Sequence, residues 1–159
     1  MNLFGVMEVS GSALEAERIR AEVVAGNMAN AETTRTAEGG PYRRKMVVFS
    51  EQGGSFASQL LGQAAGGTTG SSTGLSSGGG WDEGAGVRVT DVVEDSAPPL
   101  RRFDPGHPDA DEEGYVSYPD INPVTEMVDL MGATRAYGLN SSAVQAEKGM
   151  VAASLDILK

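Results

Sequence analysis

Apolar side chains recur every seven residues near the start of the chain, in two separate rows. The first row consists of Met7, Leu14, Ala21 and Met28, and the second of Val9, Ala16 and Val23. On a helix of 3.6 residues per turn these rows lie about 160° apart. A helix that packs against one surface needs only one apolar stripe. The pattern therefore predicts a helix over residues 6–29 that is contacted on two sides.

The last part of the chain has a longer pattern of the same kind. Asn122 and Pro123 are typical of a helix start, because proline suits the first helical turn. One row then repeats every seven residues through Leu130, Tyr137, Val144, Val151 and Leu158. This seam is widened by Ala133, Ala136, Ala143, Met150 and Ile157. The pattern predicts a coiled-coil-like helix whose many small residues permit close packing.

The middle of the chain has the composition of short strands instead. Four stretches rich in Val and aromatic residues are bounded by Gly and Pro, at 43–51, 86–95, 99–104 and 114–119. Residues 62–80 are dominated by Gly, Ser and Thr. Such a segment can bury too little to offset its ordering entropy, so we predict a flexible loop there.

Together these patterns predict an α+β fold in three parts. Residues 1–35 and 121–159 would pair as an antiparallel coiled coil and form an assembly domain. Residues 36–120 would form a small, mainly β outer module that carries the flexible loop. A lone helix that contains several glycines is marginal in water. We therefore expect the two terminal helices to pack against each other and against other subunits.

Composition limits the function. The 159 residues carry a formal net charge of −10, which argues against a nucleic-acid partner, because such partners favour a basic face. The absence of cysteine excludes disulfides, thiolate metal sites and a cysteine nucleophile. No basic segment precedes an apolar run at the start, and no run approaches the roughly 18 apolar residues of a spanning helix. We expect a soluble chain with no membrane insertion and no cleaved secretory signal.

The most specific local pattern is Asp109 to Asp120, "DADEEGYVSYPD". It has carboxylates at positions 1, 3, 5 and 12 and Gly114 at position 6, as in a calcium-binding EF-hand loop. The fit is poor, because position 12 is the short Asp120 and a strand-like segment follows the glycine. A solvated acidic turn is the preferred interpretation of this segment.

Other candidate chemistry is weaker still. His107 is the only histidine, lies between Pro105 and Pro108, and has only carboxylates nearby in the sequence. A rigid turn explains these residues better than catalysis does. The basic residues of "YRRK" (42–45) are expected to meet acidic neighbours on the same or an adjoining subunit. The sequence therefore predicts no catalytic residue, no cofactor and no metal ligand.

The two ends of the chain resemble the bacterial flagellar axial proteins, the family of rod, hook and hook-associated subunits. "GNMANAETTR" is similar to the family signature Asn-x-Ala-Asn-x-x-Thr, which falls on Asn27, Ala29, Asn30 and Thr33. "VTEMVDLMGATRAYGLN" (124–140) is similar to the family's C-terminal helix, with Arg135, Ala136, Tyr137 and Asn140. "GGPYRRKMVVF" (39–49) and "DPGHPDADEEGYVSYPDIN" (104–122) resemble the proximal-rod members. The Gly/Ser segment is longer than is typical of the family.

The resemblance implies a structural, non-enzymatic subunit. Such proteins are exported through the flagellar type III apparatus without cleavage and polymerise into the tubular rod that crosses the periplasm and transmits torque. Implied partners are further copies, other rod proteins and the export-gate or basal-ring components. The assembly interface is expected to involve the helical rows, in particular Met7, Leu14, Val23, Met28, Leu130, Tyr137, Val144, Val151 and Leu158.

The asparagine motif is interpreted as the end of the first helix. Asn30 tolerates the left-handed conformation that often ends helices, and an asparagine side chain can bond the freed carbonyl groups. Thr33 and Thr34 then favour extended backbone that leads to the outer module.

Three alternatives stay open at this point. The chain could be a distal rod or hook-type subunit of the same family, although such relatives should lack the "DPGHPDAD" loop. It could instead be a secreted calcium-binding module built on residues 109–120, or a free coiled-coil adaptor. Metal titration tests the calcium-binding module, and stable helical dimers in solution would indicate the coiled-coil adaptor.

Overall fold

The computed structural model describes residues 3–52 and 86–157, so the predicted loop 62–80 and Leu158 lie outside the described residues. The elements in order are α1 (Leu3–Ala29), β1 (Lys45–Gln52), β2 (Gly86–Glu94), β3 (Leu100–Phe103), β4 (Tyr115–Tyr118) and α3 (Pro123–Ile157). Both predicted helices and all four predicted strands are present, with ends within a few residues of those expected. The α+β class is therefore confirmed.

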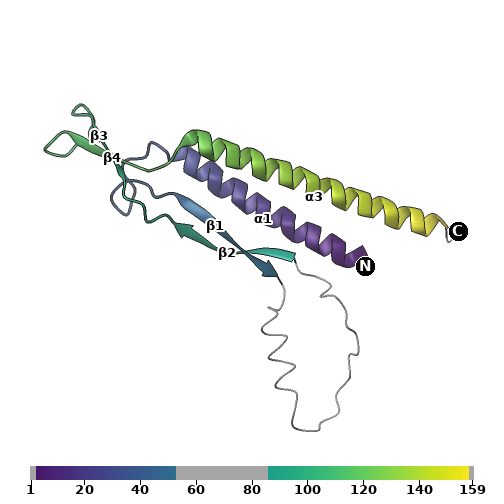
Figure 1. Ribbon diagram of the computed structural model, residues 1–159. Helices are drawn as coiled ribbons and strands as arrows, with labels where there is room; N and C mark the ends of the chain where they lie inside the picture. The colour runs from purple at the N-terminus through teal and green to yellow at the C-terminus, as the bar shows by residue number, and fades with distance from the viewer. Residues whose placement is uncertain (1–2, 53–85, 158–159) are drawn as a thin grey trace, which may run out of the picture.

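The two helices lie side by side and run in opposite directions (Figure 1). α3 has 35 residues and α1 has 27, and the C-terminal end of α3 runs past the start of α1 (Figure 1). α3 begins as predicted, because the Asn122 side chain accepts a hydrogen bond from the Val124 N–H at 3.0 Å and so caps the first turn.

None of the helices in the described part of the chain combines the length and apolar character needed to cross a membrane.

An antiparallel ribbon of β1 and β2 lies along the side of α1 that faces away from α3 (Figure 1). The register pairs Lys45 with Glu94 at one end and is interrupted by a bulge after Val48. The ribbon also contacts α1 directly, since the Val87 N–H donates to Ser12 Oγ at 3.1 Å. The prediction that α1 is contacted on two sides is confirmed, and the second partner within the chain is this ribbon. Contact of α1 with other subunits stays a prediction.

The four strands form two separate sheets instead of one. β3 and β4 make a separate two-stranded antiparallel sheet in which Leu100 pairs with Tyr118 and Phe103 with Tyr115. Gly114 precedes β4 with φ of +81°, and a Cβ there would lie 3.0 Å from the Phe103 ring. The turn into β4 therefore requires glycine.

The core of the described residues is small and unusually polar. Its buried apolar side chains are Ala16, Val24, Val116, Ile121 and Ala133. Its buried polar side chains are Ser10, Asn27, Glu126 and Glu147. Buried polar groups are costly unless they are hydrogen-bonded, and two of these four, Asn27 and Glu126, bond each other.

Candidate functional site

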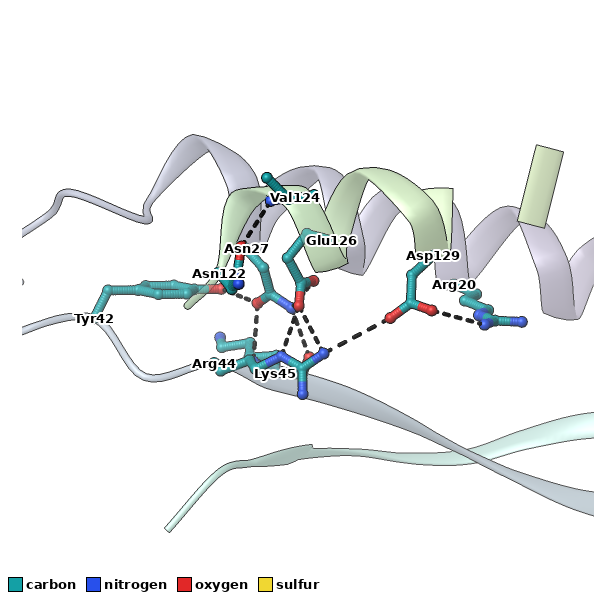
Figure 2. Close-up of polar contacts among 9 residues, drawn as sticks. All are labelled: Arg20, Asn27, Tyr42, Arg44, Lys45, Asn122, Val124, Glu126 and Asp129. Carbon is teal, nitrogen blue, oxygen red and sulfur yellow. Dashed lines mark hydrogen bonds and ion pairs between the residues drawn. The ribbon is translucent and has the colours of Figure 1, made fainter. Parts of the chain in front are cut away.

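The end of α1 is joined to two other elements by the side chain of Asn27, which is 1% exposed. Its Nδ2 donates to the Lys45 carbonyl at 2.8 Å and to Glu126 Oε2 at 3.1 Å. Its Oδ1 accepts from the Lys45 N–H at 2.9 Å and from the Tyr42 hydroxyl at 3.2 Å. Figure 2 shows these contacts converging between α1, β1 and α3. One asparagine side chain therefore links the three elements.

Glu126, in the first turn of α3, is the charged member of this cluster and is also 1% exposed. Its Oε1 accepts from Arg44 Nε at 2.7 Å and from Arg44 Nη2 at 2.6 Å. Asp129 Oδ2 lies 3.8 Å from Arg44 Nη2, and Asp129 Oδ1 lies 3.6 Å from Arg20 Nη2 (Figure 2). The predicted meeting of the "YRRK" residues with acidic neighbours is thus confirmed at Arg44.

Tyr42 closes the cluster on its outer side. Burial raises the pKa of its hydroxyl, and the carboxylates of Glu94 and Glu126 raise this pKa further. The neutral hydroxyl can therefore donate its hydrogen bond to Asn27 throughout the neutral pH range.

Asn30 ends α1, but by a different geometry from the one expected. Its Nδ2 donates to the Gly26 carbonyl at 2.9 Å, so the side chain bonds a backbone carbonyl as predicted, but this carbonyl also accepts from the Asn30 N–H at 3.1 Å and is therefore not a freed one. Its Oδ1 accepts from the Thr33 hydroxyl at 3.2 Å. The expected left-handed conformation is wrong, because within the described ranges every residue with positive φ is a glycine. The side-chain bonds stabilise the turn without it.

The loop before β4 is also tied to the asparagine motif. Asp109 Oδ2 accepts from the Thr34 hydroxyl at 2.8 Å, and Asp109 Oδ1 lies 3.6 Å from Arg35 Nη1. His107 Nδ1 accepts from the Asp109 N–H at 3.1 Å, so this histidine takes part in the rigid turn predicted here. Segments far apart in the sequence are therefore brought together at one end of the helix pair.

Residues 109–120 form a turn and a strand, unlike an EF-hand loop. Asp111 Oδ1 accepts from the backbone N–H groups of Tyr115 and Glu113, and Asp111 Oδ2 bonds Arg101 Nη2 at 2.6 Å. These bonds lower the pKa of Asp111, the Tyr115 bond most. In the described part of the chain, no three acidic or histidine side chains gather as a metal site would require.

Most residues of the predicted interface rows are half-buried within this chain. The half-buried members are Met7, Leu14, Val23, Met28, Leu130, Val144 and Val151. Ala21 and Ala25 of α1 line a shared groove with Leu130 and Ala133 of α3, whereas Val23 and Val24 lie beside β1. Tyr137 is exposed at the edge of the groove. Whether these residues also contact other molecules stays a prediction.

The remaining motif residues lie at or near the surface. Ala29 and Arg135 are exposed, and Ala136 and Thr33 are half-buried. Asn140 Nδ2 donates to the Ala136 carbonyl one turn earlier at 3.0 Å, so this asparagine bonds its own helix.

α3 has a second apolar face that sequence reasoning missed. We call it the outer stripe, and its exposed members are Val124, Val128, Met131, Leu139, Met150 and Ile157. At 100° per residue they fall within a sector of about 100°, roughly opposite the side that carries Glu126 and Ala133. Met150 and Ile157 were expected to widen the inner seam and instead lie on this outer face.

The buried polar cluster was also not predicted from the sequence. Asn27 was interpreted only as part of a helix end and Glu126 only as part of a helix start. The usable signal was that Glu126 lies seven residues before Ala133, so a carboxylate occupies a row that is otherwise directed at α1.

Comparison with known proteins shows the family of the chain. The family described as "Flagella basal body rod protein" matches residues 7–35, and "Flagellar basal body rod FlgEFG protein C-terminal" matches residues 112–157. The flagellar basal-body rod protein FlgC of Bacillus subtilis is 42% identical over the full length of both chains. The chain belongs to the FlgC family of flagellar basal-body rod proteins. FlgC of Borreliella burgdorferi is 35% identical over 100% of this chain and 99% of that protein. FlgC of Escherichia coli O6:H1 is 35% identical over 99% and 98%.

Membership in the FlgC family confirms the resemblance seen in the terminal and inner motifs. Residues 7–35 include the whole asparagine motif, and residues 112–157 include Glu126 and the outer stripe from Val124 onward. The parts of the chain that build the polar cluster are therefore mainly those by which the family is recognised.

Proposed function

We propose that this chain is a structural subunit of the flagellar basal-body rod, and that the outer stripe of α3 is its main contact with neighbouring subunits. Full-length relatedness to FlgC supports the first part. The second part rests on one observation, the exposed large apolar side chains that recur from Val124 to Ile157 on the face of α3 opposite α1. Such a face is costly in water and is typical of an interaction surface.

The proposal extends to the architecture. Residues 1–35 and 121–159 act as the assembly domain, with α1 and α3 packed as a coiled coil. The inner rows hold this pair together, and the outer stripe reaches other rod proteins and further copies. Residues 36–120 form the outer module. Head-to-tail contacts of unlike surfaces build open helical tubes, which suits a shaft that transmits torque and involves no catalytic chemistry.

The same proposal places the subunit in the periplasm-spanning rod. It would reach that position through the flagellar export apparatus without cleavage, and its neighbours at the base would include export-gate or basal-ring components. These statements rest on the family.

Complementation of a strain that lacks the chain tests the outer stripe. The double variant Val128→Asp/Leu139→Asp should leave the helical circular dichroism of the monomer unchanged, because both side chains are exposed. It should abolish swimming and leave basal bodies without a complete rod in electron micrographs. Gln145→Asp, at an exposed position outside the stripe, is the matched control and should swim normally. Wild-type swimming by the double variant would refute the assignment of the stripe.

A further inference from the structure

The apolar seam between α1 and α3 specifies its own register poorly. On both helices an apolar row repeats every seven residues, so a slide by seven places the residues of these rows opposite apolar residues again, whereas the row that contains the buried residues of α3 reads Glu126, Ala133, Asn140 and Glu147. α3 is eight residues longer than α1 (35 against 27) and extends past the start of α1 (Figure 1). A slide that brings Ala133 to the present position of Glu126 would therefore keep the whole of α1 covered.

The segment that joins β4 to α3 holds two buried residues, Pro119 and Ile121. Among the described elements, neither helix packs against β3 or β4, the sheet that leads into α3. A further tie, near the surface of the molecule, is the contact of Asp109 with Thr34 and Arg35 in the segment after α1. The register is therefore fixed in part by these segments and in part inside the helix interface.

The buried polar cluster distinguishes the two registers. Glu126, Ala133 and Glu147 share one seven-residue row on the inner side of α3 and are its three buried residues. Glu126 bonds both Arg44 and Asn27, whereas Glu147, 3% exposed, has no hydrogen bond to its Oε2 within the described residues. After the slide, Ala133 would face Arg44 and Asn27 with a methyl group. An unpaired buried charge is strongly disfavoured.

We propose that the Arg44–Glu126 ion pair is a register lock, which determines which residues of α3 lie opposite α1. A buried ion pair contributes little net stability compared with an apolar pair of similar size, but it penalises alternative packings that separate its members. Each heptad of slide would move the outer stripe by about 10 Å along α1. The inference concerns the single chain and does not depend on its role in the rod.

The distance between two spin labels tests this proposal. The chain lacks cysteine, so cysteines at the exposed positions Glu22 and Ala152 can be labelled specifically. Double electron–electron resonance on the full chain should give one distance for the otherwise wild-type protein. Replacing the ion pair by apolar residues, Arg44→Met/Glu126→Leu, should add a second population that is shorter by about 10 Å, because Ala152 moves toward Glu22 by one heptad.

Glu147→Leu is the matched control, since it replaces a buried glutamate on the same row that lacks this partner set. The control should retain the single distance, and both variants should keep wild-type helical circular dichroism. A single unshifted distance in the double variant would overturn the proposal. Loss of helicity in the double variant would also overturn it, because the ion pair would then be needed for stability. So would a broad distance distribution, without one defined distance, in the otherwise wild-type protein. The proposal would also be overturned if the Glu147→Leu control showed a second population as large as that of the double variant.

Discussion

Replacing Asn27 by alanine should destabilise the chain far more than the same change at Asn30, although both belong to one motif. Asn27→Ala removes the partners of the Lys45 N–H and carbonyl, of the Tyr42 hydroxyl and of Glu126 Oε2. Asn27 is 1% exposed, so water has little access to these groups. A buried polar group that is left without a partner costs about 1–3 kcal/mol.

The expected loss for Asn27→Ala is about 3 kcal/mol, which allows for partial replacement by Arg44 and by water that enters the space left by the side chain. Asn30 makes two polar contacts at a half-buried position, to the Gly26 carbonyl and the Thr33 hydroxyl. Because water can reach these groups, Asn30→Ala should lower the free energy of unfolding by only about 1 kcal/mol, as for loss of a helix cap. A small domain has about 5–15 kcal/mol of stability in total, so the difference is large.

Urea unfolding followed by circular dichroism at the helical band measures both changes. With an m-value of about 1–3 kcal/mol/M, Asn27→Ala should lower the midpoint by about 1–3 M and Asn30→Ala by less than half as much. Equal midpoints for the two variants, or a lower midpoint for Asn30→Ala, would refute the reasoning. That result would mean that the motif acts mainly as a helix end, as the sequence alone suggested.

Three smaller perturbations follow from single residues. Gly114→Ala should cost about 2 kcal/mol by urea unfolding, because φ of +81° and the ring beside it both oppose a Cβ. The pKa of Asp111 is lowered from 3.8 by its bond from the Tyr115 N–H and then by Arg101, so its stabilising effect is present above that pH and is lost as pH falls through the lower folded value. The protection factor of the Tyr115 amide, the ratio of its intrinsic to its observed exchange rate at the same pH, should therefore fall below about pH 4 in the wild type, and an Asp111→Asn variant should lack this dependence. Glu147→Leu should raise the urea midpoint, since it removes a buried carboxylate oxygen that has no hydrogen bond; an unchanged or lower midpoint would contradict this.

The helices and strands could be predicted because their signals are local. Rows spaced by seven residues define one face of α1 or α3, and short Val-rich stretches between Gly and Pro define β1 to β4. The outer stripe was missed for a geometric reason. A row spaced by seven drifts about 20° per heptad on a straight helix, so Met150 and Ile157, one residue before row positions, turn away from α1 toward the end of α3.

The polar cluster could not be predicted because its partners come from three separated segments. Asn27, Arg44 and Glu126 meet only when α1, β1 and α3 have been placed against one another. In sequence, each has a sufficient local explanation as a helix end, a basic surface residue or a helix start. The separation of β3 and β4 from the other sheet is likewise a tertiary outcome, since short strands carry no signal for the sheet they join.

The arrangement of partners around the two helices shows which one has surface left for assembly. α1 lies between α3 and the β1–β2 ribbon, so both of its apolar rows are largely used within the chain (Figure 1). Its exposed large apolar residues in the described part are Val6 and Val9, near its N-terminal end. Among the described residues, α3 is covered on one face alone, and its opposite face carries the outer stripe along most of its length. Contacts between subunits should therefore depend mainly on α3, while α1 fixes the position of α3 relative to the ribbon.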